Sequence, residues 1–452
     1  MRRISFSTAL LLLTICGWPI LSAYAYQNSI EPQREQLLNG LKILLQYRPA
    51  DPNVLLKLRI HSGAIFDLAG KEGTMALLAD SLFPDPGTRR YVSEELDGRL
   101  DVVTDYDLIE ITLVAPKDDF ERLVELLRNA VLNQPPDEAT FARLREARLE
   151  LLRGTSVAPN LIADRATAAR LFGSYPLGRP IIGTAESLAR ITRADLLFAR
   201  ERFLNANNAT LVMIGGVDRT RAMRAFRQLL GPWRKSETRV PATFRQPEAP
   251  NVRPLILDLP GAETAEVRFA LRGLPRRDRD RPAAEILALI ARTRWTNELP
   301  ALARTASFVR HEAHMISGLF TFGASVRAAD LAPALDAAQR VIRDLTATPP
   351  SNEELERARR ERLSTINRPL SSADALADLW LDEETYGVTT SDEARSLAAL
   401  TPADLQKVAI RLFKDAPAVT VALGDGAALR SAMANRGEVE IVRVTIPTEK
   451  SN

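Results

Sequence analysis

The chain has 452 residues, of which 46% are hydrophobic and 26% charged, and its formal net charge is +3. These proportions are those of a soluble globular protein, and the length suits two domains of roughly 200 residues each. No basic run is interleaved with aromatic side chains, which argues against nucleic acid as a ligand, and beyond the first 25 residues no stretch is apolar enough to cross a membrane.

The first 25 residues have the pattern of a secretory signal peptide. Arg2 and Arg3 form a short basic start, and residues 9–15 are an apolar run. Residues 22–25 then place small side chains at the two positions that a signal peptidase reads. We therefore expect cleavage after Ala25 and export to the periplasm, with residues 1–25 absent from the mature chain.

Two other interpretations of this leader are open. A lipoprotein signal would end at Cys16, although Ile15 stands where that processing requires a small residue. A retained anchor helix would need a longer apolar run than this one, which Gly17 and Pro19 interrupt. If the leader is removed, the only cysteine leaves with it, and the mature chain depends on packing instead of disulfides.

A series of predicted elements occurs twice along the chain. Amphipathic patterns predict helices at 120–131 and 331–345, and each is followed by a Pro-Pro pair and a long charged helix. The pairs and helices are Pro135-Pro136 with residues 137–149, and Pro349-Pro350 with residues 351–363.

The repeat is clearest between residues 187–215 and 396–424, which align without a gap at an offset of 209. In each copy Thr-x-Ala-Asp-Leu opens a helix, and an apolar, β-branched strand ending in Gly follows. The threonine fits the N-cap position and the aspartate fits the capping-box position three residues later. These residues are Thr192 and Asp195 in the first copy and Thr401 and Asp404 in the second.

The repeat predicts an α+β fold of two homologous domains, each a mainly antiparallel sheet with helices packed on one face. We place the N-terminal domain at residues 26–236, a linker at 237–252 and the C-terminal domain at 253–452. The linker lies within residues 231–254, which hold five prolines and little periodicity.

Several segments of the first half, taken in order, resemble those of a known family. They are His61-Ser62-Gly63 with Asp67 to Gly70, a helix at 73–83, the stretch Phe172-Gly-Ser-Tyr-Pro-Leu-Gly178, and residues 183–192 and 207–209. In order and spacing they resemble the pitrilysin/insulinase family of zinc peptidases, especially its mitochondrial-processing-peptidase-like branch. The resemblance covers essentially the whole mature chain and implies the same two-domain fold. In the Phe-x-x-His-Pro-Tyr-Gly stretch of that family, this chain has Tyr175 for the histidine and Leu177 for the tyrosine.

In active members of that family the helix at 73–83 carries His-x-x-Glu-His. The two histidines bind zinc from one face of the helix, and the glutamate activates the attacking water. Here the five residues are Ala76-Leu77-Leu78-Ala79-Asp80, so the degenerate positions Ala76, Ala79 and Asp80 hold neither imidazole nor base. The resemblance therefore implies a retained fold with no catalytic residue, no metal site and no cofactor.

An unusual metal site is an alternative that the sequence leaves open. Asp80 is a potential ligand, and Glu146 or Glu150 stands where the downstream glutamate of the family would be. Two carboxylates make a poor zinc site, because zinc binding in proteins favours imidazole and thiolate ligands.

The three histidines of the chain are His61, His311 and His314. If residues 311–314 are extended, their two rings point to opposite faces of a strand and do not share a metal. His61 has no second ligand near it in the sequence, so all three are interpreted as structural.

The second domain of the family carries a Leu-Arg-(x)6-Tyr pattern, whose Arg and Tyr bind the peptide. The best match here is Leu299-Pro300 with Ser307 or Phe308, and it contains neither residue. The substrate-binding residues are therefore unknown, and potential substitutes are Arg304, Arg310 and Trp295.

The features together imply a non-catalytic subunit of an exported zinc peptidase pair. This chain and an active homologue bearing His-x-x-Glu-His would form the two halves of a chamber that encloses a peptide, held by strand addition to a sheet edge. The alternative is a stand-alone peptide-binding or scaffold protein without a peptidase partner, which the missing Arg/Tyr pair favours. Expected partners are therefore the homologue and peptides, with no nucleic acid and no membrane span after signal cleavage.

Overall fold

The computed structural model describes residues 31–155, 158–238, 240, 244–367 and 372–444. Within them each half of the chain forms one six-stranded sheet, with the strand orders β1-β2-β6-β3-β5-β4 and β12-β7-β11-β8-β10-β9. The expected signal peptide and Cys16 lie outside the described residues. None of the helices in the described ranges combines the length and the hydropathy that a membrane span requires.

The first half places helices α2, α4, α8 and α9 on one face of its sheet, where its main apolar core lies. Its strands are β1 (Gln33–Gln36), β2 (Lys42–Tyr47), β3 (Asn53–Ile60), β4 (Arg99–Thr104), β5 (Ile109–Pro116) and β6 (Ala209–Gly215). Its helices are α2 (Thr74–Asp80), α3 (Pro86–Arg90), α4 (Phe120–Leu132), α5 (Glu138–Thr155), α6 (Pro159–Phe172), α7 (Ala185–Arg190), α8 (Arg193–Phe203) and α9 (Arg219–Leu230).

The second half repeats this arrangement around its own core. Its strands are β7 (Leu255–Asp258), β8 (Ala265–Gly273), β9 (Phe308–Ala313), β10 (Gly318–Val326), β11 (Val419–Gly424) and β12 (Glu440–Arg443). Its helices are α10 (Arg281–Glu298), α11 (Ala301–Arg304), α12 (Leu331–Ala347), α13 (Asn352–Asn367), α14 (Ala373–Tyr386), α15 (Thr390–Ala399), α16 (Pro402–Phe413) and α17 (Gly426–Ala432).

The two sheets share one topology, which confirms the predicted α+β class and the internal repeat. In each sheet a parallel pair, β2–β6 or β7–β11, is followed by antiparallel pairs out to β4 or β9, so both sheets are mixed. Capping boxes begin α8 and α16, where Thr192 and Thr401 accept the backbone N–H of Asp195 and Asp404. Only the outermost strand differs, because β1 precedes its neighbour and is antiparallel to it, whereas β12 ends its half and is parallel to β7.

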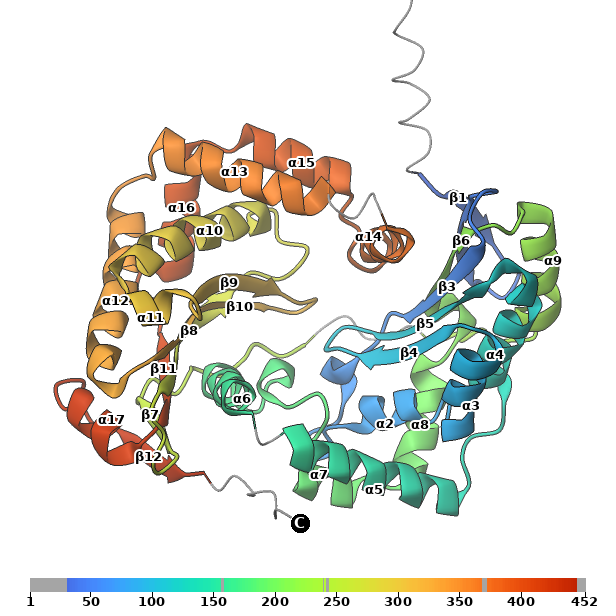
Figure 1. Cartoon of the computed structure of the whole chain (residues 1–452), viewed down its shortest axis with the longest axis horizontal. Coiled ribbons are helices and arrows are strands. Elements are labelled where there is room, and N and C mark those ends of the chain that lie inside the picture. Colours follow the sequence, from blue (N-terminus) through green and yellow to red (C-terminus); the bar gives the residue numbers. More distant parts are fainter. Residues whose placement is uncertain (1–30, 156–157, 239, 241–243, 368–371, 445–452) are drawn as a thin grey trace, which may run out of the picture.

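The opposite face of each sheet is covered by a helix from the other half of the chain. Helix α14 packs on β3 and β6 of the first sheet, and α6 packs on β8 and β11 of the second. In the first contact Trp380 and Leu381 pack against Leu55 and Ile214. Figure 1 shows this exchange, with α14 beside the first-half strands and α6 beside the second-half strands. Each sheet therefore has the predicted helices on one face and, in addition, one helix from the other half of the chain on the opposite face.

Each exchanged helix is held by a buried cation at the same place in the repeat. On β3 the Lys57 side chain is 4% exposed and lies 2.6 Å from the Asp378 carboxylate of α14. On β8 the Arg268 side chain is 2% exposed and lies 2.6 Å from the Asp164 carboxylate of α6. The strand residues that these two cations face, on β6 and β11, are 209 positions apart, so the two ion pairs are equivalent.

Further acids extend the contact of α14 along the first sheet. Asp374 and Asp382 stand one helical turn to either side of Asp378, and they lie 2.5 Å from Lys57 and 2.6 Å from Arg59, respectively. Lys57 and Arg59 point to this face because successive strand residues alternate between faces, and their neighbours Leu56 and Leu58 enter the main core. Burial of these two cations is tolerable because each is paired with carboxylates.

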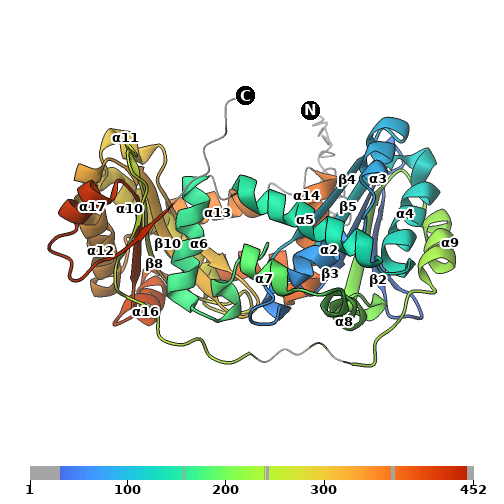
Figure 2. The ribbon, with the colours of Figure 1, turned by 90° about the horizontal axis from the view of Figure 1, so that it is seen from below.

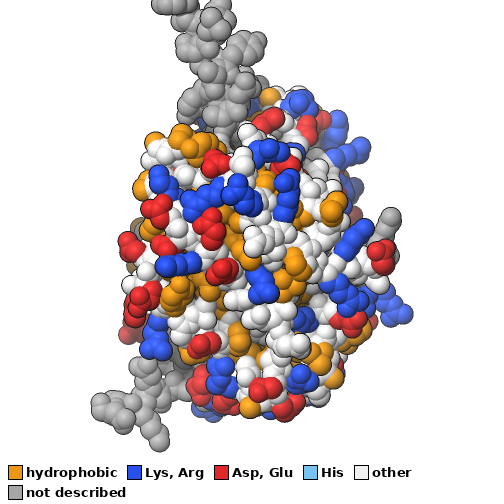
Figure 3. Space-filling model, turned by 90° about the vertical axis from the view of Figure 1, so that its right-hand side faces the viewer, with side chains coloured by type: hydrophobic (Ala, Val, Ile, Leu, Met, Phe, Trp, Pro, Cys, Tyr) orange, Lys and Arg blue, Asp and Glu red, His pale blue; other side chains and the backbone are white. Residues whose placement is uncertain are grey.

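The two halves form a broken ring when they are viewed down the shortest axis (Figure 1), and a long connection joins them along one side (Figure 2). Helix α9 ends at Leu230 and β7 begins at Leu255, and the described residues between them, which include most of the expected linker, contain neither helix nor strand. On the outer face of the first half, acidic and basic side chains are interspersed with apolar ones (Figure 3).

Candidate functional site: the degenerate zinc helix

Helix α2 carries the degenerate motif and is buried along nearly its whole length, from Thr74 to Ala79. Its start is fixed by Asp67, whose carboxylate accepts the backbone N–H of Gly73 at 2.8 Å and of Met75 at 2.9 Å. Gly73 has φ +96°, a conformation that favours glycine. Burial raises the pKa of Asp67 to about 7, against these two hydrogen bonds. The local sequence therefore still builds the helix that would present a zinc site.

An arginine from α5 lies against the motif face of α2. The Arg148 guanidinium donates to the Asp80 carboxylate at 3.0 Å from Nε and 2.6 Å from Nη2, and Nη2 also donates to the Ala76 carbonyl at 3.1 Å. The Arg148 side chain is only 10% exposed and that of Asp80 is 34% exposed. The guanidinium thus joins the first and last motif positions, which lie one turn apart on the face that two histidines would share.

These residues do not fit a zinc ion. The two alanines offer no ligand, and the one carboxylate on the motif face is engaged by a cation that would repel zinc. Burial raises the pKa of Asp80, and Arg148 lowers it only in part. Across the described ranges, no group of three or more His, Cys, Asp or Glu side chains is positioned to hold a metal ion.

The two candidate downstream ligands point away from this site. Glu146 and Glu150 are exposed on α5, where both pair with Arg153. Arg148 lies between them in the sequence but on the buried face of the helix, which it shares with Leu144. The side chain of α5 that contacts the motif face of α2 is therefore Arg148, in place of a glutamate.

A pocket of about 290 Å³ opens beside the ion pair, and the edge strand β4 contributes to it. Its lining includes Asp80, Arg148 and, from β4, Val102. Within the described part of the chain, β4 pairs with β5 along one edge and has no strand along the other. Val103 of this strand is 54% exposed. The degenerate site thus borders a sheet edge that is open to an added strand.

In the described residues the three histidines lie in separate environments, and His314 is in a turn instead of on a strand. His61 lies between the hydroxyls of Thr385 (3.0 Å) and Thr210 (2.9 Å), and burial together with nearby Arg59 lowers its pKa to about 4. His311 on β9 accepts the backbone N–H of Leu274 at 2.9 Å. His314 lies in the turn between β9 and β10 and faces the first half of the chain.

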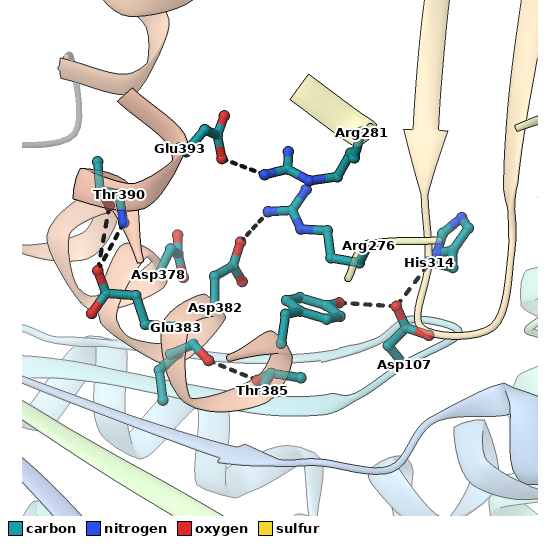
Figure 4. Close-up of polar contacts among 12 residues, drawn as sticks. Asp107, Arg276, Arg281, His314, Asp378, Asp382, Glu383, Thr385, Thr390 and Glu393 are labelled. Atoms are coloured by element: carbon teal, nitrogen blue, oxygen red, sulfur yellow. Dashed lines mark hydrogen bonds and ion pairs between the residues drawn. The ribbon is translucent and has the colours of Figure 1, made fainter. Parts of the chain in front are cut away.

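Asp107 of the first half contacts Tyr386 and His314 of the second half (Figure 4). Its carboxylate is buried and accepts from the Tyr386 hydroxyl at 2.9 Å and from the backbone N–H of Met315 at 2.9 and 3.1 Å. The His314 ring lies 3.7 Å away. Burial disfavours the charged ring, but this carboxylate outweighs burial and raises the pKa of His314. Nearby, Arg276 of the β8–α10 loop donates to Asp382 of α14 at 2.8 Å, as Figure 4 also shows.

The stretch 172–178, which departs from the family pattern at Tyr175 and Leu177, also joins the halves. Phe172 and Leu177 are fully buried in a cluster with second-half residues, and Tyr175 stacks on Phe172 with 5.9 Å between ring centroids. Gly178 is required there, because a Cβ would lie 2.3 Å from the Gly173 carbonyl oxygen.

The potential substitutes for the missing Arg/Tyr pair are mostly structural. Trp295 is buried and donates to the Ala334 carbonyl at 2.9 Å, and Arg304 donates to the Leu299 carbonyl at 2.8 Å. Arg310 lies on the edge strand β9, with its side chain 42% exposed and its guanidinium over Phe308. Of the three, only Arg310 is presented at an open strand edge.

The functional residue that sequence reasoning missed is Arg148. A signal for it existed, since Phe141, Leu144 and Arg148 recur at helical spacing and are all buried. An arginine on the apolar face of a helix requires an acceptor, and Asp80 of the motif is the nearest in the fold.

Comparison with known proteins gives a consistent set of relatives. The model of a domain described as the peptidase M16 inactive domain matches residues 190–362. An uncharacterized zinc protease of Rickettsia felis is 21% identical over 207 residues, which are 45% of this chain and 50% of that protein. Mitochondrial-processing peptidase subunit beta of Neurospora crassa is 24% identical over 197 residues (42% and 41%), and bovine cytochrome b-c1 complex subunit 1 is 23% identical over 237 residues (51% and 48%). The chain spans about half the length of these curated relatives.

Solved structures share the whole two-domain fold. A protease from Helicobacter pylori superposes with a TM-score of 0.77 at 18% identity, covering 87% of this chain and 99% of that one. A structure described as the peptidase M16 inactive domain from Pseudomonas fluorescens has a TM-score of 0.75 at 20% identity, with 87% and 98% covered. At such identities the likeness concerns the fold.

Proposed function

We propose that this chain, which is similar to the peptidase M16 inactive domain over residues 190–362 and shares the two-domain fold of M16-like structures, is the non-catalytic subunit of an exported zinc peptidase pair. Its partner would be a homologue that bears His-x-x-Glu-His, and the two chains would enclose a peptide between them. The chain would supply wall surface and a strand edge, and the partner would supply zinc and the general base.

The observation that carries this proposal is the ion pair between Arg148 and Asp80 on the motif face of α2. Simple loss of the zinc ligands would leave a cavity or unpaired polar groups, which are costly in a protein interior. Here a guanidinium satisfies both Asp80 and the Ala76 carbonyl. These satisfied contacts at the motif positions support the proposal of a chain that binds peptides without zinc.

Strand addition is the mode of peptide binding that the sheet edges favour. β4 and β9 end the two sheets, and the β4–β5 and β9–β10 turns meet where Asp107 accepts the Met315 N–H. An extended peptide on β4 would pass the pocket beside Asp80 and Arg148. The cationic rim of this pocket suits an acidic or carbonyl-rich segment, because Arg89, Arg143 and Arg148 all contribute to it.

Co-purification tests the pairing. The tagged protein is recovered from its native periplasmic extract, and every chain that elutes with it is identified by mass spectrometry. We expect a stoichiometric homologue with His-x-x-Glu-His. Recovery of the bait alone, or with unrelated proteins, would count against a peptidase pair.

A stand-alone binding or scaffold role is the second candidate. It is favoured by the absent Arg/Tyr pair and by the similarity to a protein named as a subunit of the cytochrome b-c1 complex. In this case the bait would co-elute with a constant set of other proteins and would not change the activity of any zinc peptidase of the same cell.

A further inference from the structure

A second pocket, of about 400 Å³, lies apart from the degenerate site, between α5, α6, the β4–β5 turn and the segment before α7. Figure 2 shows α5, α6 and α7 near one another at the junction of the two halves. Among the described residues, the charged members of its lining are Arg165 of α6 and Arg179, and none of them is an acid. The remaining lining is mainly apolar and small: Tyr106, Leu152, Ala166, Ala168, Ala169, Gly178, Pro180, Gly183, Thr184 and Ala185.

The two guanidinium groups lack the partners that buried arginines normally have. The Arg179 side chain is 12% exposed, its nearest carboxylate, Glu72, is 4.0 Å away, and its Nε is buried without a hydrogen-bond partner. Arg165 is half-buried and has neither an ion pair nor a hydrogen bond from its side chain to any described residue. Desolvation lowers the pKa of both groups, and for Arg179 it outweighs the opposing effect of the Glu72 and Asp67 carboxylates.

Both arginines also lie in the same pocket as Tyr106, whose position is fixed by hydrogen bonds. The Tyr106 hydroxyl donates to the carbonyls of Leu177 (3.2 Å) and Arg179 (3.0 Å). The pocket is therefore largely apolar and contains two positive charges, of which only Arg179 has a carboxylate nearby, that of Glu72 at 4.0 Å. A buried charge without a partner is unfavourable, so the site gains stability when an anion enters.

We propose that this pocket binds a carboxylate with an apolar body, namely the C-terminal residue of a bound peptide. Guanidinium groups bind carboxylates through paired hydrogen bonds, and the volume is in the range of small-molecule sites. Leu152 of this pocket lies one turn beyond Arg148 on α5, so this pocket and the degenerate site lie along the same helix. The carboxylate site stands on the pocket alone, and its assignment to a peptide C-terminus rests on the proposed function.

Calorimetric titration of the purified mature chain tests the proposal without any partner subunit. The ligands are the tripeptide acetyl-Ala-Ala-Leu with a free carboxylate, the same peptide as its C-terminal amide, octanoate and inorganic phosphate. We expect the peptide acid to bind at least about 10-fold more tightly than the amide, as the loss of a charge-assisted hydrogen bond implies. Arg165→Gln and Arg179→Gln should each weaken binding of the acid by a similar factor. Arg128→Gln, which removes the same charge from an exposed position on α4, should leave binding unchanged.

The possible outcomes separate the parts of the proposal. Binding of octanoate without the peptide acid would keep the carboxylate pocket but overturn its assignment to a peptide C-terminus. Phosphate binding tighter than either carboxylate would overturn the ligand class. Equal binding of acid and amide, no binding of any ligand, or unchanged affinity in both arginine variants would overturn the site itself. As a second readout, Arg179→Gln should have a Tm no lower than the parent, and a marked drop in Tm would indicate a structural arginine instead.

Discussion

Breaking the pair between Asp80 and Arg148 should destabilise the protein through one identifiable contact. Arg148→Met removes two hydrogen bonds to the Asp80 carboxylate and one to the Ala76 carbonyl while it keeps most of the side-chain volume. Breaking a fully buried pair costs about 3–5 kcal/mol, and an exposed pair contributes below about 1 kcal/mol. Because the Asp80 side chain is 34% exposed, we expect a cost of about 2 kcal/mol.

A double-mutant cycle isolates the pair from its surroundings. Asp80→Asn should cost a similar amount, because it leaves the 10%-exposed guanidinium of Arg148 without a counter-charge. If the two residues act on each other, the double variant costs about as much as either single variant, and the coupling energy is about 1–2 kcal/mol. Urea unfolding followed by circular dichroism measures all four proteins. The matched control is Arg122→Met on the surface of α4, which should change stability by less than about 0.5 kcal/mol. Additive costs in the double variant would refute the idea that the pair stabilises the degenerate site.

Three further predictions concern acid stability, the exchanged helices and the zinc site. The folded pKa of His61, about 4, is below its unfolded value of 6.5, so the unfolded state binds the proton first and stability is lost as pH falls through this window. Between pH 7 and pH 4 we expect His61→Gln to lose about 3 kcal/mol less stability than the parent in urea unfolding, and parallel curves would contradict the shift. Arg268→Met should lower the free energy of unfolding by about 2–3 kcal/mol, because it removes the ion pair that holds α6 on β8. Lys407→Met removes an exposed ion pair and should leave the free energy of unfolding almost unchanged. Equal effects of the two substitutions in thermal unfolding would contradict the role of Arg268 in holding α6. The triple variant Ala76→His, Ala79→Glu and Asp80→His restores the His-x-x-Glu-His motif, but in a zinc titration it should not bind zinc while Arg148 is present. Zinc binding should appear once Arg148→Glu is added. Zinc binding by the triple variant itself would show that the guanidinium does not block the site.

The elements of the fold that follow from local pattern were predictable from the sequence. The capping boxes at Thr192 and Thr401 and the strands that follow them are local in the chain, and their repetition at a fixed offset predicted two similar domains. Amphipathic spacing likewise predicted α4 and α12. Local hydrogen bonds and periodic burial determine such elements, so one sequence contains enough information to place them.

The exchange of α6 and α14 was not predictable in the same way. The burial of Leu376 and Trp380 on α14 depends on a sheet that lies more than 150 residues away in the sequence, and periodicity does not identify the covering partner. The same holds for Arg148, whose partner Asp80 is 68 residues distant. The absence of His-x-x-Glu-His was visible in the sequence, but the ion pair in its place required the three-dimensional arrangement of α2 and α5.

Mixing the chain with the proposed partner, an active homologue from the same cell, tests the central claim most directly. Hydrolysis of a fluorogenic peptide library is measured for purified residues 26–452 of this chain, for a homologue from the same cell that carries His-x-x-Glu-His, and for the two together, each with and without a chelator. The account predicts no hydrolysis by this chain alone and strong, chelator-sensitive hydrolysis by the mixture, well above that of the homologue alone. Chelator-sensitive hydrolysis by this chain alone, or a homologue whose activity is the same with and without it, would contradict the account.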